Sequence, residues 1–474
     1  MNPNDKNYSA IDASCRVPLL ALLGGAVVWL IVGLALALVA SLVFHMPDKF
    51  ADCPFLSYGR LLPAANDAIV YGFAIPAALG VVLWIFARLS ETELELPLVP
   101  IAAAHLWHLG VLLGVGAILI GNSTGFLWLE FPRYSSILIF LAYLLIAISA
   151  FATFGGRRER PLQPAHWFLL AGLFWFPWIY STANLFLVAF PVRGITQAVI
   201  DYWFANNLLF VWMGLIGLGV AFYLLSKISG RATQGGHYVL FGFWTFVLFA
   251  PWCGMPQTAP IPAWLPAVSS VASGLTVVSL IAFIVVYLKT VYGVQVECKG
   301  GPYCHAKFAI AAFVLSSLLY LCLGCPDFGR ILGLSWWGPT QTQFEIFGFF
   351  AVAICGAIYD LLPGVMNFEL PFPKFVRLQH WLFMLGVALV VAPLLYGGWQ
   401  QGSAMQKASV AFPDIIQGTL LYLRISTLGL LFLLLGSLLL AANIFSMTIR
   451  WHMGVVKCVL TAVKAPLETQ EVKS

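Results

Sequence analysis

Long apolar runs separated by short polar segments follow one another along almost the whole chain. A helix needs about 20 apolar residues to cross a bilayer core, and none of these runs alternates apolar and polar residues with a period of two. Because backbone polar groups in lipid must satisfy one another, the runs predict spanning α-helices. We predict an all-α polytopic membrane protein with twelve transmembrane helices, at residues 17–44, 63–88, 97–121, 134–155, 164–190, 198–227, 236–253, 262–289, 305–325, 341–363, 376–398 and 414–449.

Composition supports the same class of protein. Of the 474 residues, 61% are hydrophobic and 9% are charged, against about 25% charged in an ordinary soluble domain. These values exclude a soluble enzyme, a disordered chain and a nucleic-acid-binding protein. The first apolar run is too long for the core of a signal peptide, so we expect it to remain as helix 1. The expected organisation is a tail at residues 1–16, a membrane domain at 17–449 and a second tail at 450–474.

The positions of the basic residues predict the orientation of the bundle. With twelve helices, both termini lie on the same side as the loops after helices 2, 4, 6, 8 and 10. That side collects all of the 24 Lys and Arg residues except seven: Lys49, Arg60, Arg133, Arg193, Arg330, Lys407 and Arg424. Since cytoplasmic loops carry an excess of Lys and Arg, both termini should be cytoplasmic in a bacterial inner membrane.

One set of polar residues in or beside the predicted spans gathers in one leaflet. Under this topology the members of this set all fall in the outer leaflet: Asn66, Asp67, Ser181, Thr182, Asn184, Asn206, Asn207, Gln257, Gln341, Gln343 and Glu345. Polar groups at membrane depth are costly and are candidates for function. Two interpretations stay open: interhelical hydrogen bonds, worth about 0.6 kcal/mol each, or a present or former cofactor cavity.

A set of short stretches between Tyr58 and Met447 carries a family resemblance. They lie at residues 57–63, 68–73, 165–168, 183–185, 203–207, 252–254, 262–264, 356–359 and 362–363. In their order, spacing and helix count they resemble subunit I of the haem–copper oxidases, most nearly the C-family, or cbb-type, cytochrome c oxidases. The resemblance implies the twelve-helix bundle of that subunit. It also implies a low-spin haem between helices 2 and 10, and a high-spin haem and copper among helices 6, 7 and 10.

The chain departs from this family at the metal ligands. The family's low-spin haem histidine of helix 2 falls on Ala65, and the copper histidine of helix 6 falls on Asn206. The tyrosine of the copper site falls on Ala250, and the histidine pair after helix 7 falls on Pro256 and Gln257. The two haem histidines of helix 10 fall on Gln341 and Gln343. Alanine and proline cannot bind a metal, and carboxamides suit neither haem iron nor copper.

Two functions from different classes follow. In the first, the chain is a non-catalytic subunit of a respiratory complex, with no catalytic or metal-binding residue, no cofactor, and c-type cytochromes as expected partners. In the second, it is an active terminal oxidase or nitric oxide reductase that holds haem b and copper through relocated ligands. The histidines available for this are His45, His105, His108, His166, His237, His305, His380 and His452. A channel or transporter using the emptied cavity is a third possibility.

Other residues that could carry chemistry have weaker patterns. His105 and His108 lie at i, i+3 of one helix and would need further ligands to bind a metal. Cys322 and Cys325 form a C-x-x-C without a following histidine, which is compatible with a disulfide or with chance. Cys298, Cys304 and His305 lack a fourth metal ligand. Glu345 and Asp360 are expected to pair with a cation such as Arg377 or Arg424.

The predicted orientation can be tested with reporter fusions. A reporter placed after Arg158 and one placed after Ser474 should both give a cytoplasmic signal, because the basic loops stay on the cytoplasmic side. A fusion after Arg193 serves as the control and should report the opposite side. A periplasmic signal at either of the first two sites would contradict the orientation.

Overall fold

The structure is a computed structural model that describes residues 3–158, 162–231, 233, 235–296 and 298–471. Its α-helices are α1 (Pro3–His45), α2 (Tyr58–Asp67), α3 (Ile75–Ser90), α4 (Leu98–Ile120), α5 (Arg133–Gly155), α6 (Pro164–Ala183), α7 (Ile195–Asn206), α8 (Met213–Ser229), α9 (Gly236–Phe249), α10 (Trp264–Val291), α11 (Pro302–Gly324), α12 (Pro326–Leu332), α13 (Trp337–Gln343), α14 (Ala351–Met366), α15 (Pro373–Met405) and α16 (Phe412–Glu471). Short 3₁₀ turns are η1 (Pro47–Lys49), η2 (Pro54–Leu56) and η6 (Ala250–Trp252). Four segments are π-helical: η3 (Ala68–Ala74), η4 (Asn184–Ala189), η5 (Asn207–Trp212) and η7 (Phe344–Phe350).

The predicted all-α membrane bundle is confirmed. Within the described part of the chain, 11 helical spans are long and apolar enough to cross a membrane. Several of them join two α-helices through a π-helical segment, as α2, η3 and α3 do in the span Tyr58–Ser90. The remaining predicted helix, at residues 236–253, corresponds to α9. It has 14 residues and is followed by the turn η6, which contains Pro251. It is therefore shorter than the other spans.

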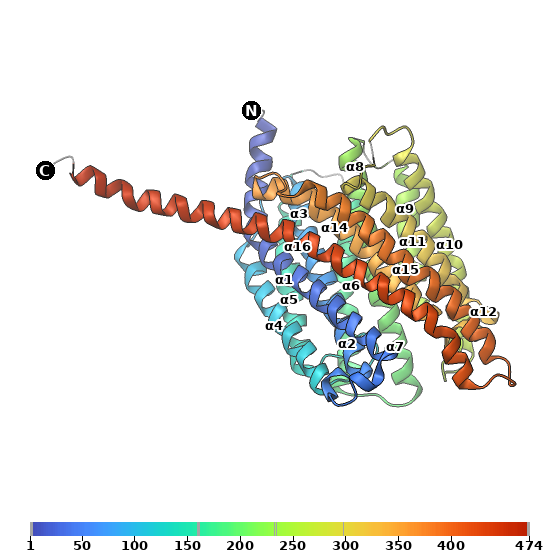
Figure 1. Cartoon of the computed structure of the whole chain (residues 1–474). Coiled ribbons are helices and arrows are strands. Elements are labelled where there is room, and N and C mark those ends of the chain that lie inside the picture. The colour runs from blue at the N-terminus through green and yellow to red at the C-terminus, as the bar shows by residue number, and fades with distance from the viewer. Residues whose placement is uncertain (1–2, 159–161, 232, 234, 297, 472–474) are drawn as a thin grey trace.

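The two end helices extend into the predicted tails. α1 begins at Pro3 and α16 continues to Glu471, so most of both tails is helical. Residues 1–2 and 472–474 lie outside the described part. Figure 1 shows α16 crossing the bundle at a tilt and continuing beyond it as a single helix.

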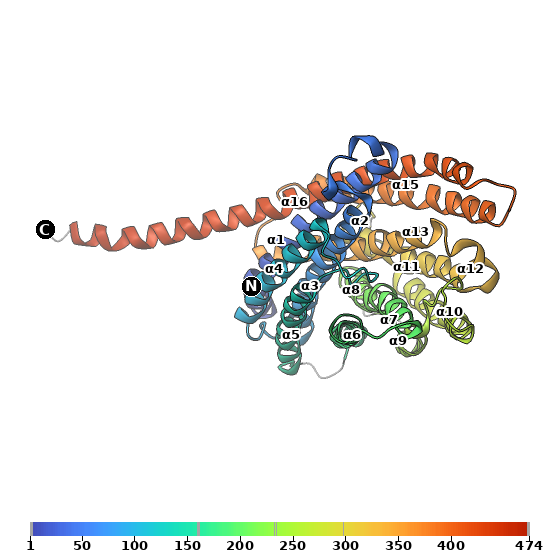
Figure 2. The ribbon, with the colours of Figure 1, turned by 90° about the horizontal axis from the view of Figure 1, so that it is seen from below.

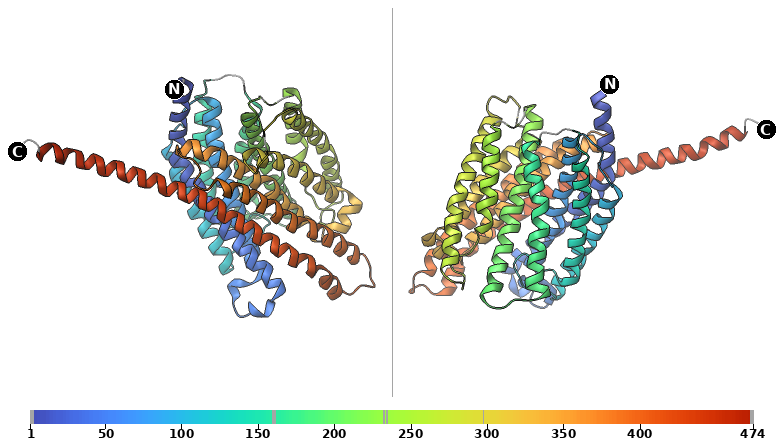
Figure 3. Two further views of the ribbon diagram at one scale, coloured as in Figure 1. Left: turned by 45° about the horizontal axis from the view of Figure 1, so that its top comes forward. Right: turned by 180° about the vertical axis from the view of Figure 1, so that it is seen from behind.

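The helices lie around the bundle in the order in which they follow one another in the sequence. Seen from below, the helices run from α1 through α5, α6 and α10 to the α15–α16 hairpin, and α16 contacts α1 again (Figure 2). The views in Figure 3 agree with this arrangement. The spans at 58–90, 195–229 and 337–366 are the most buried, so they form the centre and the other spans enclose them. The candidate residues of helices 2, 6 and 10 all lie on these three central spans.

Ionic and polar contacts hold the helices together at the end of the bundle where the chain begins. Asp12 of α1 accepts hydrogen bonds from Trp84 and Arg88 of α3 at 2.9 and 3.0 Å. Arg16 donates to the carbonyl of Val365, 2.6 Å away. Lys227 pairs with Asp360 at 2.6 Å, so the expected cation partner of Asp360 is confirmed, with a lysine in place of Arg377 or Arg424. These contacts bring the predicted cytoplasmic loops to one end.

The more buried of the two ion pairs at this end should contribute more to the stability of the fold than the more exposed one. In the Arg88–Asp12 pair the side chains are 18% and 6% exposed, whereas in the Lys227–Asp360 pair they are 36% and 13% exposed. Asp12→Ala leaves the half-buried guanidinium of Arg88 without its buried carboxylate partner, and we expect it to lower the free energy of unfolding by about 2 kcal/mol. The control Asp360→Ala should cost about 1 kcal/mol or less. Thermal unfolding in detergent measures both, and equal losses would contradict the expected effect of burial.

Candidate functional site

Irregular helix geometry coincides with the polar positions of the central spans. The π-helical segment η3 begins directly after Asp67, and η5 begins at Asn207, next to Asn206. Segment η7 begins directly after Gln343. A π-helical segment widens the helix and re-aims the side chains beside it, and such segments are frequent at functional sites. Three central spans therefore change their geometry at the level of the candidate residues.

Asn206 is the centre of the first group of contacts. Its Nδ2 donates to the carbonyl of Ala250, 3.0 Å away, and its Oδ1 accepts from the hydroxyl of Tyr320 at 2.7 Å. Gly254, at a φ of +91°, lies so close that a Cβ there would be 2.5 Å from the Asn206 Cβ. The structure thus brings Asn206 and Ala250 together, as their predicted common site requires.

Gln341 belongs to a second group of contacts, with Glu345 one turn further along the chain. Ser316 of α11 donates to Glu345 Oε2 at 2.7 Å, and Gln341 Nε2 donates to Ser316 Oγ at 3.2 Å. All three side chains are buried. The expected pairing of Glu345 with an arginine is wrong, because a hydroxyl and a carboxamide surround its carboxyl group.

Gln257 is directed to other partners. Its Nε2 donates to Ser270 Oγ of α10 at 2.8 Å and to the carbonyl of Pro266 at 3.3 Å. Gly329 of α12 lies against the same side chain. Gln257 therefore ties its loop to α10 and α12. Pro256 precedes it in that loop and has no side-chain donor.

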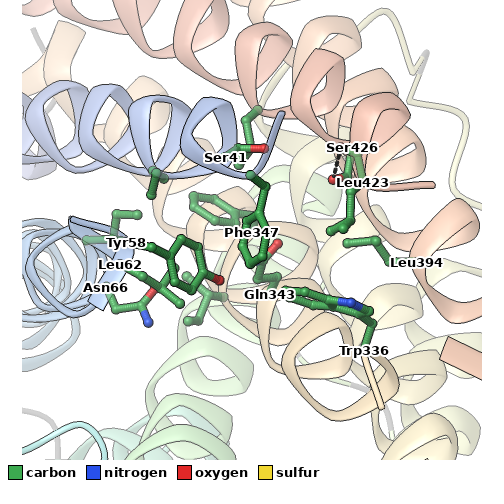
Figure 4. Close-up of a pocket in the computed structure, with 16 residues that line it drawn as sticks. Ser41, Tyr58, Leu62, Asn66, Trp336, Gln343, Phe347, Leu394, Leu423 and Ser426 are labelled. Carbon is green, nitrogen blue, oxygen red and sulfur yellow. Dashed lines mark hydrogen bonds between the residues drawn. The ribbon is translucent and has the colours of Figure 1, made fainter. Parts of the chain in front are cut away.

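Gln343 lines a small pocket rather than joining either group of contacts. The pocket has a volume of about 60 Å³ and is walled by α1, α2, η7, α15 and α16. Figure 4 shows Asn66, Tyr58 and Gln343 on its wall, with Trp336 also lining it. Ala65 does not line this pocket. It is fully buried, and Gly33 of α1 lies against its carbonyl group.

Comparisons with known proteins place this arrangement in a family. The sequence model described as cytochrome c and quinol oxidase polypeptide I matches residues 17–432. The chain belongs to this family. It is 22% identical, over 79% of its own length and 81% of the relative's, to the cbb3-type cytochrome c oxidase subunit CcoN1 of Stutzerimonas stutzeri. It is 21% identical to a cytochrome c oxidase subunit 1 homolog of Azorhizobium caulinodans, over 89% of this chain and 80% of that one.

A solved structure supports the same fold. The cryo-EM structure of a heme-copper terminal oxidase dimer superposes with a TM-score of 0.75 at 11% identity, covering 91% of this chain and 84% of the other. The expected resemblance to subunit I is therefore confirmed. The three central spans thus belong to a bundle with the fold of this family.

Aromatic rings from η5, α9, α11 and η7 pack together inside the bundle. Phe313 lies 4.8 Å from Phe349, 6.0 Å from Phe246 and 6.2 Å from Phe210, measured between ring centroids. Phe349 also lies on Gly217, where a Cβ would be 2.4 Å from the ring. Phe210 also lies 4.9 Å from Tyr320, which donates to Asn206, so this ring cluster adjoins the Asn206 group.

The side chains gathered here do not fit a haem or a copper ion. Imidazole is the ligand that suits both metals, whereas carboxamide oxygens are hard, weak donors. The amides of Asn206 and Gln341 already have hydrogen-bond partners. The pocket beside Gln343, at about 60 Å³, is far smaller than the roughly 300–1,000 Å³ typical of cofactor sites.

The sequence analysis did not identify Glu130, an acidic residue that lies beside the central spans. The carboxyl of Glu130, in the loop before α5, lies next to that of Asp67, and both residues are buried. Asp201 of α7 is nearby and accepts a hydrogen bond from the backbone N–H of Leu127 at 2.9 Å. Glu130 could have been found from the sequence, because it is an acidic residue within the apolar segment that precedes α5.

The weaker candidates are not brought together as sites. His105 is exposed and His108 lies against Gly25 of α1, so the two rings do not converge. Cys322 and Cys325 are free thiols. Cys298 and Cys304 form a disulfide, which removes the thiolates that a metal site with His305 would need.

Glu130 should make stability depend on pH. Burial, with the nearby charge of Asp201 adding to it, raises the pKa of Glu130 from 4.5 to about 7. A carboxyl whose pKa is raised by folding stabilises the folded state below its unfolded pKa, and this contribution is lost as pH rises through the folded value.

We therefore expect the melting temperature to fall by a few degrees between about pH 5 and pH 7. Glu130→Gln should remove this part of the pH dependence, and thermal unfolding at each pH measures it. The exposed residue Asp48 offers a matched control, Asp48→Asn, which should keep the slope. An unchanged slope in Glu130→Gln would contradict the assignment.

Proposed function

We propose that this chain is a non-catalytic membrane subunit of a respiratory electron-transfer complex, which keeps the fold of oxidase subunit I and has exchanged its metal site for a packed interior. The observation that carries the proposal is the occupation of that interior. Hydrogen-bonded amides stand at positions that, by the family resemblance, would hold the high-spin haem and copper, and a cluster of phenylalanine rings adjoins them.

The amide contacts support a stable replacement rather than a damaged site. A buried carboxamide without partners is costly, yet Asn206 and Gln341 each have a partner on a different helix. Gly217 and Gly254 leave room for Phe349 and Asn206, respectively. Such mutual fit indicates that this interior contributes to the stability of the bundle.

The partners follow from the same reasoning. A subunit without its own redox centres needs other subunits to take part in electron transfer. By the resemblance, we propose membrane-anchored c-type cytochromes as the companions, within the bacterial inner membrane and with both termini of this chain cytoplasmic.

Family membership favours a second function, that of an active oxidase with relocated ligands. Its best candidates are His305 and His380, two buried rings whose centroids are 4.4 Å apart. His305 lies in the first turn of α11, about 22 Å along that helix from Tyr320. His305 also contacts Gln379 and the carbonyl of Gly301. Because Tyr320 belongs to the Asn206 group, His305 lies far from that group. The second function therefore has less support than the first.

A reduced-minus-oxidised spectrum tests the proposal. We expect the isolated chain to show no stoichiometric haem band and metal analysis to find no stoichiometric copper, because the side chains at the resembled ligand positions do not bind these metals. Purification in a mild detergent should bring haem-containing companions that a harsher detergent removes. A haem or copper that stays with the isolated chain at about one per chain would overturn the proposal.

A double variant provides the converse control. Ala65→His with Gln343→His places imidazoles at the resembled low-spin haem position of helix 2 and at one of the two haem positions of helix 10. We expect it to remain without haem, because Ala65 is fully buried and the pocket beside Gln343, at about 60 Å³, cannot hold a porphyrin. Haem uptake would show that the cavity opens and that only its ligands were lost.

A further inference from the structure

Beyond Trp451, the last part of α16 packs against no other element of the described chain. From residue 449 to residue 461 every side chain is exposed except that of Trp451, which is partly buried. The three ribbon views agree that this part leaves the bundle alone and runs crosswise to most of the other helices (Figures 1 to 3). An isolated helix of this length is marginally stable in water, so a surface that covers it would stabilise it.

The projecting segment has two chemically different faces. Arg450 and Lys457 are seven residues apart, or about two turns, and therefore lie on one face. Asn443 is a further seven residues back on the same face, and its side chain accepts a hydrogen bond from the backbone N–H of Phe372 at 3.1 Å. Phe372 belongs to the loop between α14 and α15. The basic face thus continues the side of α16 that meets the predicted cytoplasmic loops.

The arc centred on Val456, about 100° around the helix from the basic face, is apolar. Met453, Val456, Val459 and Leu460 are each 55–56% exposed. Within the bundle, α16 already presents exposed residues such as Leu428 and Leu438 to the surrounding lipid, and the apolar arc follows them without a break in the helix. A helix with an apolar arc and Lys or Arg on its polar face is typical of segments that lie in a membrane interface.

We propose that residues 449–461 form an interfacial helix that lies in the cytoplasmic surface of the membrane and binds anionic phospholipid headgroups. The apolar arc enters the region of the acyl chains, while Arg450 and Lys457 reach the headgroup phosphates. Lipid fits better than a protein partner for two reasons. The segment starts where α16 leaves the bundle at the predicted membrane surface, and its basic face complements the negative charge of the cytoplasmic leaflet.

Spin labels on the two faces test the proposal in the full-length chain. The background replaces the more accessible thiols by serine at Cys53, Cys322, Cys325 and Cys458. One variant then adds Val456→Cys on the apolar arc, and the other adds Thr461→Cys on the basic face. Both are reconstituted in nanodiscs of phosphatidylcholine with phosphatidylglycerol.

We expect the label at 456 to collide mainly with oxygen, which is enriched in lipid, and the label at 461 to collide mainly with a water-soluble nickel complex. Strong nickel collisions at both sites would overturn the proposal, because the helix would then be free in water. Protection of both sites from both reagents would also overturn it, because protein would then cover the helix.

The charge dependence provides a second measurement. Arg450→Gln and Lys457→Gln should each lower the ratio of docked to undocked helix by about fivefold in anionic nanodiscs. Neither should have this effect in nanodiscs of phosphatidylcholine alone. Lys407→Gln, in the loop at the other end of α16, is the matched control and should change nothing. Both basic side chains are exposed, so the variants should fold, and an equal effect in neutral lipid would overturn the role of the headgroups.

Discussion

The interior of this bundle depends on one constraint, namely that polar groups buried at membrane depth must find partners within the protein. The central spans carry amides and carboxyls at the level of their π-helical segments. In an oxidase of this family, metals and haems would provide bonds at that level. Here Asn206 and Gln341 form hydrogen bonds with Tyr320 and Ser316 instead. The interior is therefore stabilised by contacts between helices.

Aromatic packing complements these hydrogen bonds. Phe313, Phe349 and their neighbours fill space that small residues such as Gly217 leave open. Large apolar side chains gain many weak dispersion contacts in a close-packed interior. Under the proposed function, such packing lets the oxidase fold keep its helix arrangement without planar cofactors.

The two ends of the bundle have different character. At the predicted cytoplasmic end, Asp12, Arg88, Lys227 and Asp360 form ion pairs between helices that are distant in sequence. At the opposite end, Asp67 and Glu130 are carboxyls without a cation among the groups described around them. The first arrangement holds the helix ends together, and α16 projects from that end. The second makes the outer end sensitive to protonation, because two neighbouring carboxyls cannot both be charged at low cost.

Much of the fold could be predicted from the sequence because the requirement for apolar spans acts locally. The lengths of the spans, their all-helical character and the grouping of Asn206 with Ala250 follow from hydropathy, topology and resemblance. The partners of the buried polar groups could not be predicted, since they depend on how helices rotate against one another. Thus Glu345 meets Ser316 rather than an arginine, and Gln257 turns to α10. The burial of Glu130 beside Asp67 and the projection of α16 beyond the bundle were decided by tertiary packing, because only the assembled helices determine which side chains are covered and which helix is left without a neighbour.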